Sequence, residues 1–153
     1  MARLDRLPEP LRTVVAGLEC PTFATNPWVE GPPLSMRRVA IISTAGLHRR
    51  DDRPFQIMSG EYRIIPGEPP TSDLVMSHTS TNFDRTGFQQ DLNLVFPLDR
   101  LRGLAERTII GSVANFHYSF MGAADPRSME SAARDLAGVL KKDHVNGVLL
   151  VPV

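Results

Sequence analysis

The apolar residues of this chain recur with two different periods, and each period predicts a different kind of element. The first pattern has the i, i+3, i+4, i+7 spacing of a one-sided helix and follows Pro10, which suits a first helical turn. Its members are Leu11, Val14, Val15 and Leu18. We therefore predict a short amphipathic helix near the N-terminus.

Residues 21–35 break this pattern. The segment contains four prolines, a glycine and the only tryptophan of the chain, Trp28. Prolines restrict the residues before them to extended conformations. We predict an extended surface connection that Trp28 anchors by packing.

Residues 38–44 form a nearly continuous β-favouring run that ends at Ala45-Gly46, the pattern of a strand buried on both faces. We predict a central parallel strand there. A second candidate strand covers residues 73–78. A shorter candidate, residues 61–65, stops at Pro66 and is expected at a sheet edge.

The last third of the chain has the pattern of a strand, a helix and a second strand, and another helix precedes them. Pro97 opens a helix with one apolar face, and residues 108–115 follow as a strand. Asp125 is a candidate cap for a longer helix that begins at Pro126, and residues 148–153 form an apolar strand of the buried type. Strands joined by such a crossover run parallel.

These elements predict an α/β fold, a three-layer sandwich with a mostly parallel sheet of about four to five strands, flavodoxin-like or Rossmann-like. With 153 residues the chain should form a single domain. Residues 1–36 would supply the N-terminal helix and the proline-rich connection, and residues 37–153 the sheet-forming core.

Composition narrows the classes of function. Apolar residues make up 42% of the chain, and 17 basic residues balance 17 acidic ones, so nucleic acid is not an expected partner. The charged N-terminus lacks the apolar run of a secretory signal, and no segment is long enough to span a membrane. We expect a cytoplasmic protein. Its single cysteine, Cys20, excludes an internal disulfide and fits an ordinary small apolar role.

The candidate chemistry lies at predicted strand ends. His48, His78 and His117 each fall at the carboxyl end of a predicted strand, and such ends meet at one edge of a parallel sheet. Histidine could act as a general acid or hold a carboxylate, so we predict His78 and His117 as catalytic and His48 as substrate-binding. Loop and helix-capping roles are the alternative. A metal site completed by Asp84 or Asp91 lacks tight ligand spacing, and we predict no metal.

Other polar residues could line the same cleft. Backbone amides of residues 44–47 could hold a carboxylate or phosphate, which brings Thr44 and Gly46 into the predicted site. Capping of the backbone is the alternative for Asp91 and Asn93. The full set predicted to bind substrate is Thr44, Gly46, His48, Asp84, Asp91, Asn93, Tyr118 and Ser119.

The chain also stops inside its last apolar strand, at Val153. Chain ends are usually polar or frayed, and ligands of open α/β sheets gather just beyond the carboxyl ends of strands. We expect the next residue to sit at the active edge. A short protein whose final strand docks in the core is the alternative, and the pattern alone does not decide between them.

Several stretches together resemble the B-subunit family of the glycine, sarcosine, betaine and D-proline reductases. They are residues 38–48, 75–78, 91–101, 111–112, 117–122 and 147–153, and their order and spacing cover most of residues 38–153. In that family the last strand is followed by a selenocysteine or a cysteine. Because selenocysteine is encoded by UGA, a chain that ends at Val153 is what a misread reading frame would give.

The resemblance implies reductive cleavage of the C–N bond of a small amine or amino acid by a selenolate or thiolate nucleophile, which a dithiol then restores. It implies no cofactor within this chain, and as partners other reductase subunits or a thioredoxin-like donor, in an oligomer. We expect this chain alone to be inactive. The alternatives are a non-enzymatic α/β module that binds a small ligand, and a small hydrolase-like or isomerase-like enzyme that uses the histidines.

Overall fold

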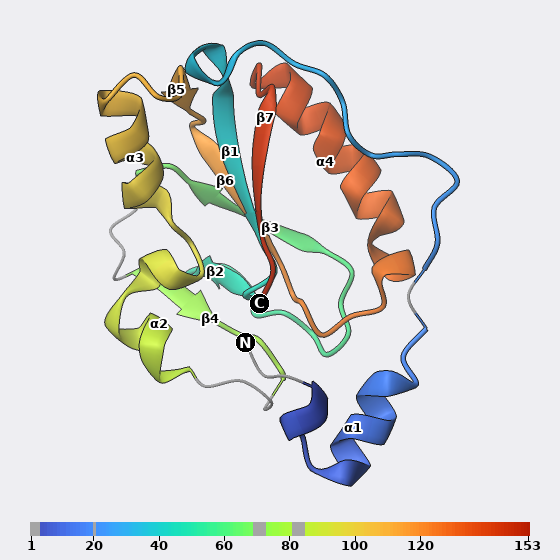
Figure 1. Cartoon of the computed structure of the whole chain (residues 1–153). Helices are drawn as coiled ribbons and strands as arrows, with labels where there is room; N and C mark the ends of the chain where they lie inside the picture. Colours follow the sequence, from blue (N-terminus) through green and yellow to red (C-terminus); the bar gives the residue numbers. More distant parts are fainter. Residues whose placement is uncertain (1–3, 20, 69–72, 81–84) are drawn as a thin grey trace.

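The computed structural model describes residues 4–19, 21–68, 73–80 and 85–153 of the chain. Strand β1 (Arg38–Ser43) is the centre of its five-stranded sheet (Figure 1). On one side β1 pairs in parallel with β5 (Ser112–Val113) and then with β6 (Phe116–Phe120). On its other side β1 pairs in parallel with β7 (Gly147–Val151). β1 is thus a central strand with parallel neighbours, as predicted, whereas its pairing with the final strand was not part of the prediction.

The sheet is mixed, because β3 (Tyr62–Pro66) runs antiparallel to β6. The strand predicted over residues 61–65 is thus confirmed, and it occupies an edge of the sheet. The α/β class is confirmed as well. The mostly parallel, flavodoxin-like or Rossmann-like three-layer arrangement is not.

Two short strands stand apart from this sheet. β2 (Leu47–Arg49) and β4 (Leu74–Met76) form an antiparallel pair. β4 is the strand predicted over residues 73–78, but its partner β2 was not predicted. The strand predicted over residues 108–115 is also shorter than expected, since only β5 forms within it, and β6 follows as a separate strand.

The helices cover opposite faces of the sheet. α3 (Leu98–Glu106) packs on one face, where Leu98 and Leu101 join a core cluster with Ile41. α4 (Glu130–Lys142) packs on the other and buries Leu136. The described residues also form α2 (Thr86–Gln90) and the 3-10 turns η1 (Leu4–Arg6), η2 (Leu34–Met36), η4 (Leu92–Leu94) and η5 (Pro126–Met129). No helix among the described residues has both the length and the apolar character needed to cross a membrane.

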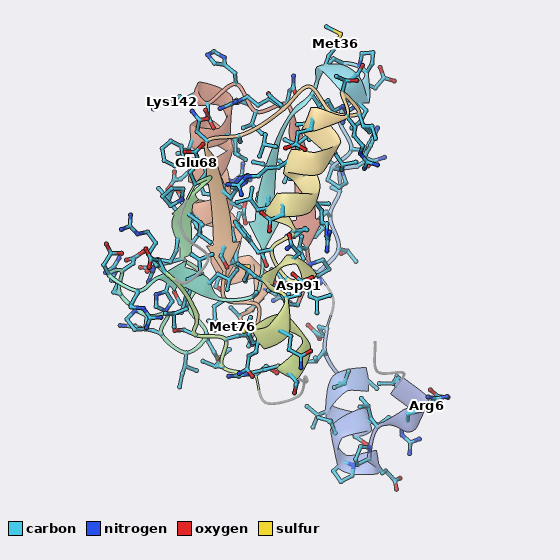
Figure 2. The ribbon with its side chains drawn as sticks, turned by 90° about the vertical axis from the view of Figure 1, so that its left-hand side faces the viewer. Arg6, Met36, Glu68, Met76, Asp91 and Lys142 are labelled. Atoms are coloured by element: carbon cyan, nitrogen blue, oxygen red, sulfur yellow. The ribbon has the colours of Figure 1, made fainter. Side chains whose placement is uncertain are left out.

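Residues 4–19 and 21–33, called here the N-terminal arm, lead from η2 past α4 to a helix that lies apart from this body (Figure 1). α1 (Glu9–Ala16) is the predicted amphipathic helix, yet none of its residues is buried. Figure 2 shows the part of the arm that carries Arg6 set well apart from the sheet. The packing predicted for Trp28 is wrong, because its side chain is 73% exposed.

Candidate functional site

The end of β7 is fixed to the end of β1 through Thr44. The Thr44 backbone N–H donates to the Val151 carbonyl at 3.0 Å. The Val153 N–H then donates to the Thr44 hydroxyl oxygen at 2.8 Å. Thr44 uses its third polar group as well, since its carbonyl accepts the Gly122 N–H at 2.9 Å. One residue therefore ties the last residues of β7 to the segment that follows β6.

Three segments close in on Gly122. A side-chain carbon placed on this glycine would lie 2.8 Å from the backbone carbonyl oxygen of Thr44 and 2.9 Å from that of Val153. It would also lie 3.0 Å from His78 Nε2. Such distances are too short for any real side chain. Only glycine allows the end of β7 and the His78 imidazole to meet here, and we call these four residues the β7-end site.

The His78 ring is oriented in this site by a hydrogen bond to its Nδ1. Its Nδ1 accepts the Ser80 N–H at 3.1 Å, so the neutral ring carries its proton on Nε2, the atom beside Gly122. Burial of the ring and the positive charge of Arg85 both lower the His78 pKa. A neutral imidazole with a directed N–H suits a carboxylate or carbonyl oxygen of a ligand better than it suits storage of a proton.

Gly46 forms the wall behind His78. It has a φ of +66°, and a side-chain carbon on it would lie 2.8 Å from the His78 backbone nitrogen. The left-handed conformation and the close approach both require glycine. Its N–H donates to the Phe120 carbonyl, and its own carbonyl accepts the Ser77 N–H.

The amides of the predicted anion-binding turn are all engaged within the protein. Those of residues 44 and 46 donate to backbone carbonyls. Those of residues 45 and 47 donate to the hydroxyl oxygens of Ser43 and Ser119. A ligand anion at this turn would therefore need side-chain donors, and the positions of Thr44 and Gly46 in the site rest on packing.

His48 and Ser119 contribute to the frame around the site. His48 is buried in β2, with Nε2 2.7 Å from the Ser77 hydroxyl and Nδ1 2.7 Å from the Arg49 carbonyl. Ser119 is fully buried and accepts the Leu47 N–H at 2.9 Å. Both side chains hold β2 and the segment of His78 in place. Their predicted contact with substrate stays a prediction.

His117 lies away from the β7-end site. It is fully buried in β6, five residues before Gly122, which corresponds to roughly 16 Å along a strand. Its Nδ1 accepts the Ile41 N–H at 3.0 Å where β5 has ended and β6 is beginning. The imidazole thus replaces a missing backbone acceptor. Burial, with the charge of Arg102 as a smaller cause, lowers its pKa to about 4. Its catalytic role stays a prediction, and these surroundings favour a structural one.

Tyr118 points to the opposite face of the sheet. Its ring packs edge to face on Tyr62, with centroids 5.7 Å apart, in the cluster that α4 covers. Burial raises the pKa of its hydroxyl. The structure therefore does not bring Tyr118 together with His78.

Asp91 and Asn93 make hydrogen bonds of the backbone-capping kind, which was the alternative to substrate binding. Asp91 Oδ1 accepts both the backbone N–H and the side-chain amide of Asn93, each at 2.9 Å. Asn93 Oδ1 in turn accepts the Asp99 N–H at the start of α3. These Asn93 hydrogen bonds are the main cause of a lowered Asp91 pKa. The predicted site residue Asp84 and the cysteine Cys20 lie outside the described residues. Within the described ranges, no three histidine, cysteine or acidic side chains come together as a metal site.

Sequence reasoning missed two residues that shape this site. Gly122 appeared only within the stretch 117–122, and nothing in the local sequence showed that three segments meet there. Arg85 binds the carbonyls of His78 and Ser80, each at 2.7 Å, and so fixes the loop that carries the imidazole. A basic residue shortly after the predicted strand was the only available signal.

Comparisons with known proteins place the chain in a family. Residues 33–153 match the family model described as glycine/sarcosine/betaine reductase selenoprotein B. The D-proline reductase subunit gamma of Acetoanaerobium sticklandii is 32% identical over 146 residues, which cover 90% of this chain and 60% of that protein. The sarcosine reductase complex component B subunit beta of Peptoclostridium acidaminophilum is 29% identical over 130 residues, 82% of this chain and 29% of that protein.

The chain thus spans about 60% and 29% of the lengths of these two curated relatives. No solved structure matches it. Both relatives are, by name, subunits of reductases. Since the family match extends over residues 33–153, the chain belongs to the glycine/sarcosine/betaine reductase selenoprotein B family.

Proposed function

We propose that this chain forms the substrate-side part of a reductase that cleaves the C–N bond of a small amine or amino acid, with glycine, sarcosine, betaine and D-proline as candidate substrates. The observation that carries the proposal is the meeting of Thr44, Val153 and His78 at Gly122. It supports a site directly beyond the end of β7, where ligands of α/β sheets commonly bind.

His78 would orient the substrate. As a neutral ring with its proton on Nε2, it would donate a hydrogen bond to a carboxylate oxygen, a group that all four candidate substrates carry. The lowered His78 pKa supports this role over proton storage, because an imidazolium at this position is disfavoured by burial and by Arg85. The proton for the leaving amine would then come from another group or from water.

The redox residue, as proposed, is a selenocysteine or cysteine directly after Val153. Its anion would attack the substrate carbon, form a carbon–chalcogen bond and expel the amine. A thiolate would then attack the chalcogen, so that a chalcogen–sulfur bond forms and the carbon leaves with the bonding electrons and takes a proton from water. A dithiol from another subunit or from a thioredoxin-like donor would supply the two electrons that restore the anion. The chain of 153 residues carries only Cys20, so we expect no reductase activity from it alone.

The codon after Val153 tests the redox part of the proposal. We expect an in-frame UGA, or a cysteine codon, followed by a coding segment. A UAA or UAG codon would contradict that part and would leave a module that binds a small ligand without redox chemistry.

Ligand binding tests the site itself, independently of the codon. Isothermal titration of the full chain with the four candidate substrates should detect one that binds, and His78→Ala should weaken its binding at least tenfold, because the bond to a charged acceptor is lost. His144→Ala is the matched control, as it removes an exposed histidine beyond α4. Binding that His78→Ala leaves unchanged would contradict the assignment.

A further inference from the structure

Hydrogen bonds within residues 78–80, called here the His78 turn, orient the imidazole relative to the turn itself. His78 Nδ1 accepts the Ser80 N–H, and Arg85 donates to the carbonyls of His78 and Ser80. These groups belong to one short segment of the chain, so they would move together with the ring. The position of His78 Nε2 against Gly122 therefore depends on contacts that join the turn to the rest of the fold.

One such contact lies directly before the ring, at Ser77. The Ser77 N–H donates to the Gly46 carbonyl at 2.9 Å, and the Ser77 hydroxyl lies 2.7 Å from His48 Nε2. His48 is a buried residue of β2. These two hydrogen bonds fix the N-terminal side of the His78 turn to β2 and to the loop that precedes it.

The second contact lies directly after the ring, at Thr79. The Thr79 hydroxyl lies 3.3 Å from Met121 Sδ, and because a thioether has no hydrogen to donate, the hydroxyl is the donor. Met121 is fully buried, pairs with Ala45 in a β-bridge and immediately precedes Gly122. The sulfur is thus a fixed point beside the glycine that His78 Nε2 approaches.

We propose that Thr79 is a positioning residue, which holds Nε2 of His78 against Gly122 through its hydrogen bond to Met121. The consequence for ligand binding rests on the proposed function, whereas the positioning itself does not. A thioether is a weak acceptor, so this bond contributes little to the free energy of unfolding. Its effect is on direction, because Thr79 and Ser77 fix the turn on both sides of the ring, and one of these two ties is lost without the Thr79 hydroxyl.

The loss of this tie should be visible in the His78 ring. Burial is the main cause of the lowered His78 pKa, and the positive charge of Arg85 is the second. A turn released from Met121 lets water reach the imidazole, so the pKa should rise toward the ordinary histidine value of 6.5. Arg85 is bound to the turn and moves with it, so its effect on the ring should change little between variants.

NMR titration of the full chain with ¹⁵N-labelled histidine measures the His78 pKa, and His78→Ala assigns the signal. Thr79→Val replaces the hydroxyl with a methyl group and should raise this pKa. Thr79→Ser keeps a hydroxyl and should retain the wild-type pKa, whereas a role of Thr79 in packing alone would make the loss of its methyl group the more disruptive change. Thr13→Val is the matched control, because it removes an exposed threonine hydroxyl that binds the Glu9 carbonyl in α1.

Met121→Leu tests the acceptor side of the same bond. It removes the sulfur at a similar side-chain volume, so the fold should be retained, which circular dichroism checks. It should raise the His78 pKa as Thr79→Val does. The double variant should raise it no further, because either change alone already abolishes the hydrogen bond.

Ligand binding separates this proposal from the proposed function. A candidate substrate that binds the wild-type chain should bind Thr79→Val about three- to tenfold more weakly, and Thr79→Ser with wild-type affinity. If none of the four candidates binds the wild-type chain, the proposed function fails, and the titration alone decides the positioning. A His78 pKa that Thr79→Val leaves unchanged, a shift in Thr79→Ser as large as in Thr79→Val, or a doubled shift in the double variant would each overturn the proposal.

Discussion

His117 should make the stability of this protein sensitive to mild acid. The folded protein holds the neutral ring, with Nδ1 as the acceptor for the Ile41 N–H. Protonation would charge a fully buried side chain and would also place two donors face to face. The substitution that isolates this effect is His117→Asn, because an asparagine oxygen can accept the same N–H but cannot titrate.

The magnitude follows from the two pKa values. Burial lowers the His117 pKa from 6.5 to about 4 in the folded state, so the unfolded chain binds the proton more tightly. The free energy of unfolding therefore falls as the pH drops below 6.5. The loss attributable to His117 is about 2 kcal/mol between pH 7 and pH 5, and it approaches about 3 kcal/mol below pH 4.

Urea unfolding followed by circular dichroism at pH 7, 6 and 5 measures this difference. The wild-type chain should lose about 2 kcal/mol more than the His117→Asn variant over that range. Carboxylates and His78 titrate in both proteins, so they cancel in the comparison. His144→Asn, the exposed control, should retain the wild-type profile. Equal pH dependence in wild type and His117→Asn would refute the reasoning.

Three further substitutions test the packing around the site. Gly46→Ala should lower the free energy of unfolding by at least about 2 kcal/mol, because φ is +66° and the added side-chain carbon would lie 2.8 Å from the His78 backbone nitrogen. Gly103→Ala, in open space on α3, should raise it by about 0.5–1 kcal/mol, and urea unfolding compares the two variants. Thr44→Val should cost about 1–2 kcal/mol and speed hydrogen exchange at the end of β7, since the Val153 N–H loses its acceptor; protection equal to wild type would contradict this. Leu101→Ala should cost 2–5 kcal/mol, roughly, through a cavity under α3, and a smaller loss would show that the core collapses around it.

Much of the local structure was predictable because its signals are local. Three examples are the apolar run of β1, the apolar stripe of α3 and the Asp125 cap before η5. The residues that make up each of these signals are close together in the sequence. β7 was recognised for the same reason. The crossover rule predicted that the last strands run parallel, but it did not predict β1 as the partner of β7.

The features that were missed depend on long-range contacts. β2 forms because β4 arrives beside it, and the break between β5 and β6 is stabilised by an imidazole from His117. The exposure of Trp28 depends on where the arm goes after it leaves the body. Periodicity carries none of this information.

In the candidate site too, some residues were predictable from local sequence and others depend on long-range contacts. The sequence led to His78 and Thr44 because both lie at the ends of predicted strands. It also led to His117 and Tyr118, since the predicted strand stopped at residue 115, whereas both residues lie inside the separate strand β6. The decisive role of Gly122 required the positions of three segments that are distant in the chain.

The central claim is that the end of β7 delivers the residue after Val153 to the His78 imidazole. The most direct test appends a single cysteine after Val153 in a Cys20→Ser background and measures its thiol pKa from the pH dependence of alkylation. A thiolate beside the Nε2–H of His78 should be stabilised, so His78→Ala should raise that pKa by about one unit, while His144→Ala should not. A thiol pKa near the ordinary ~8.5 that does not respond to the loss of His78 would contradict the claim.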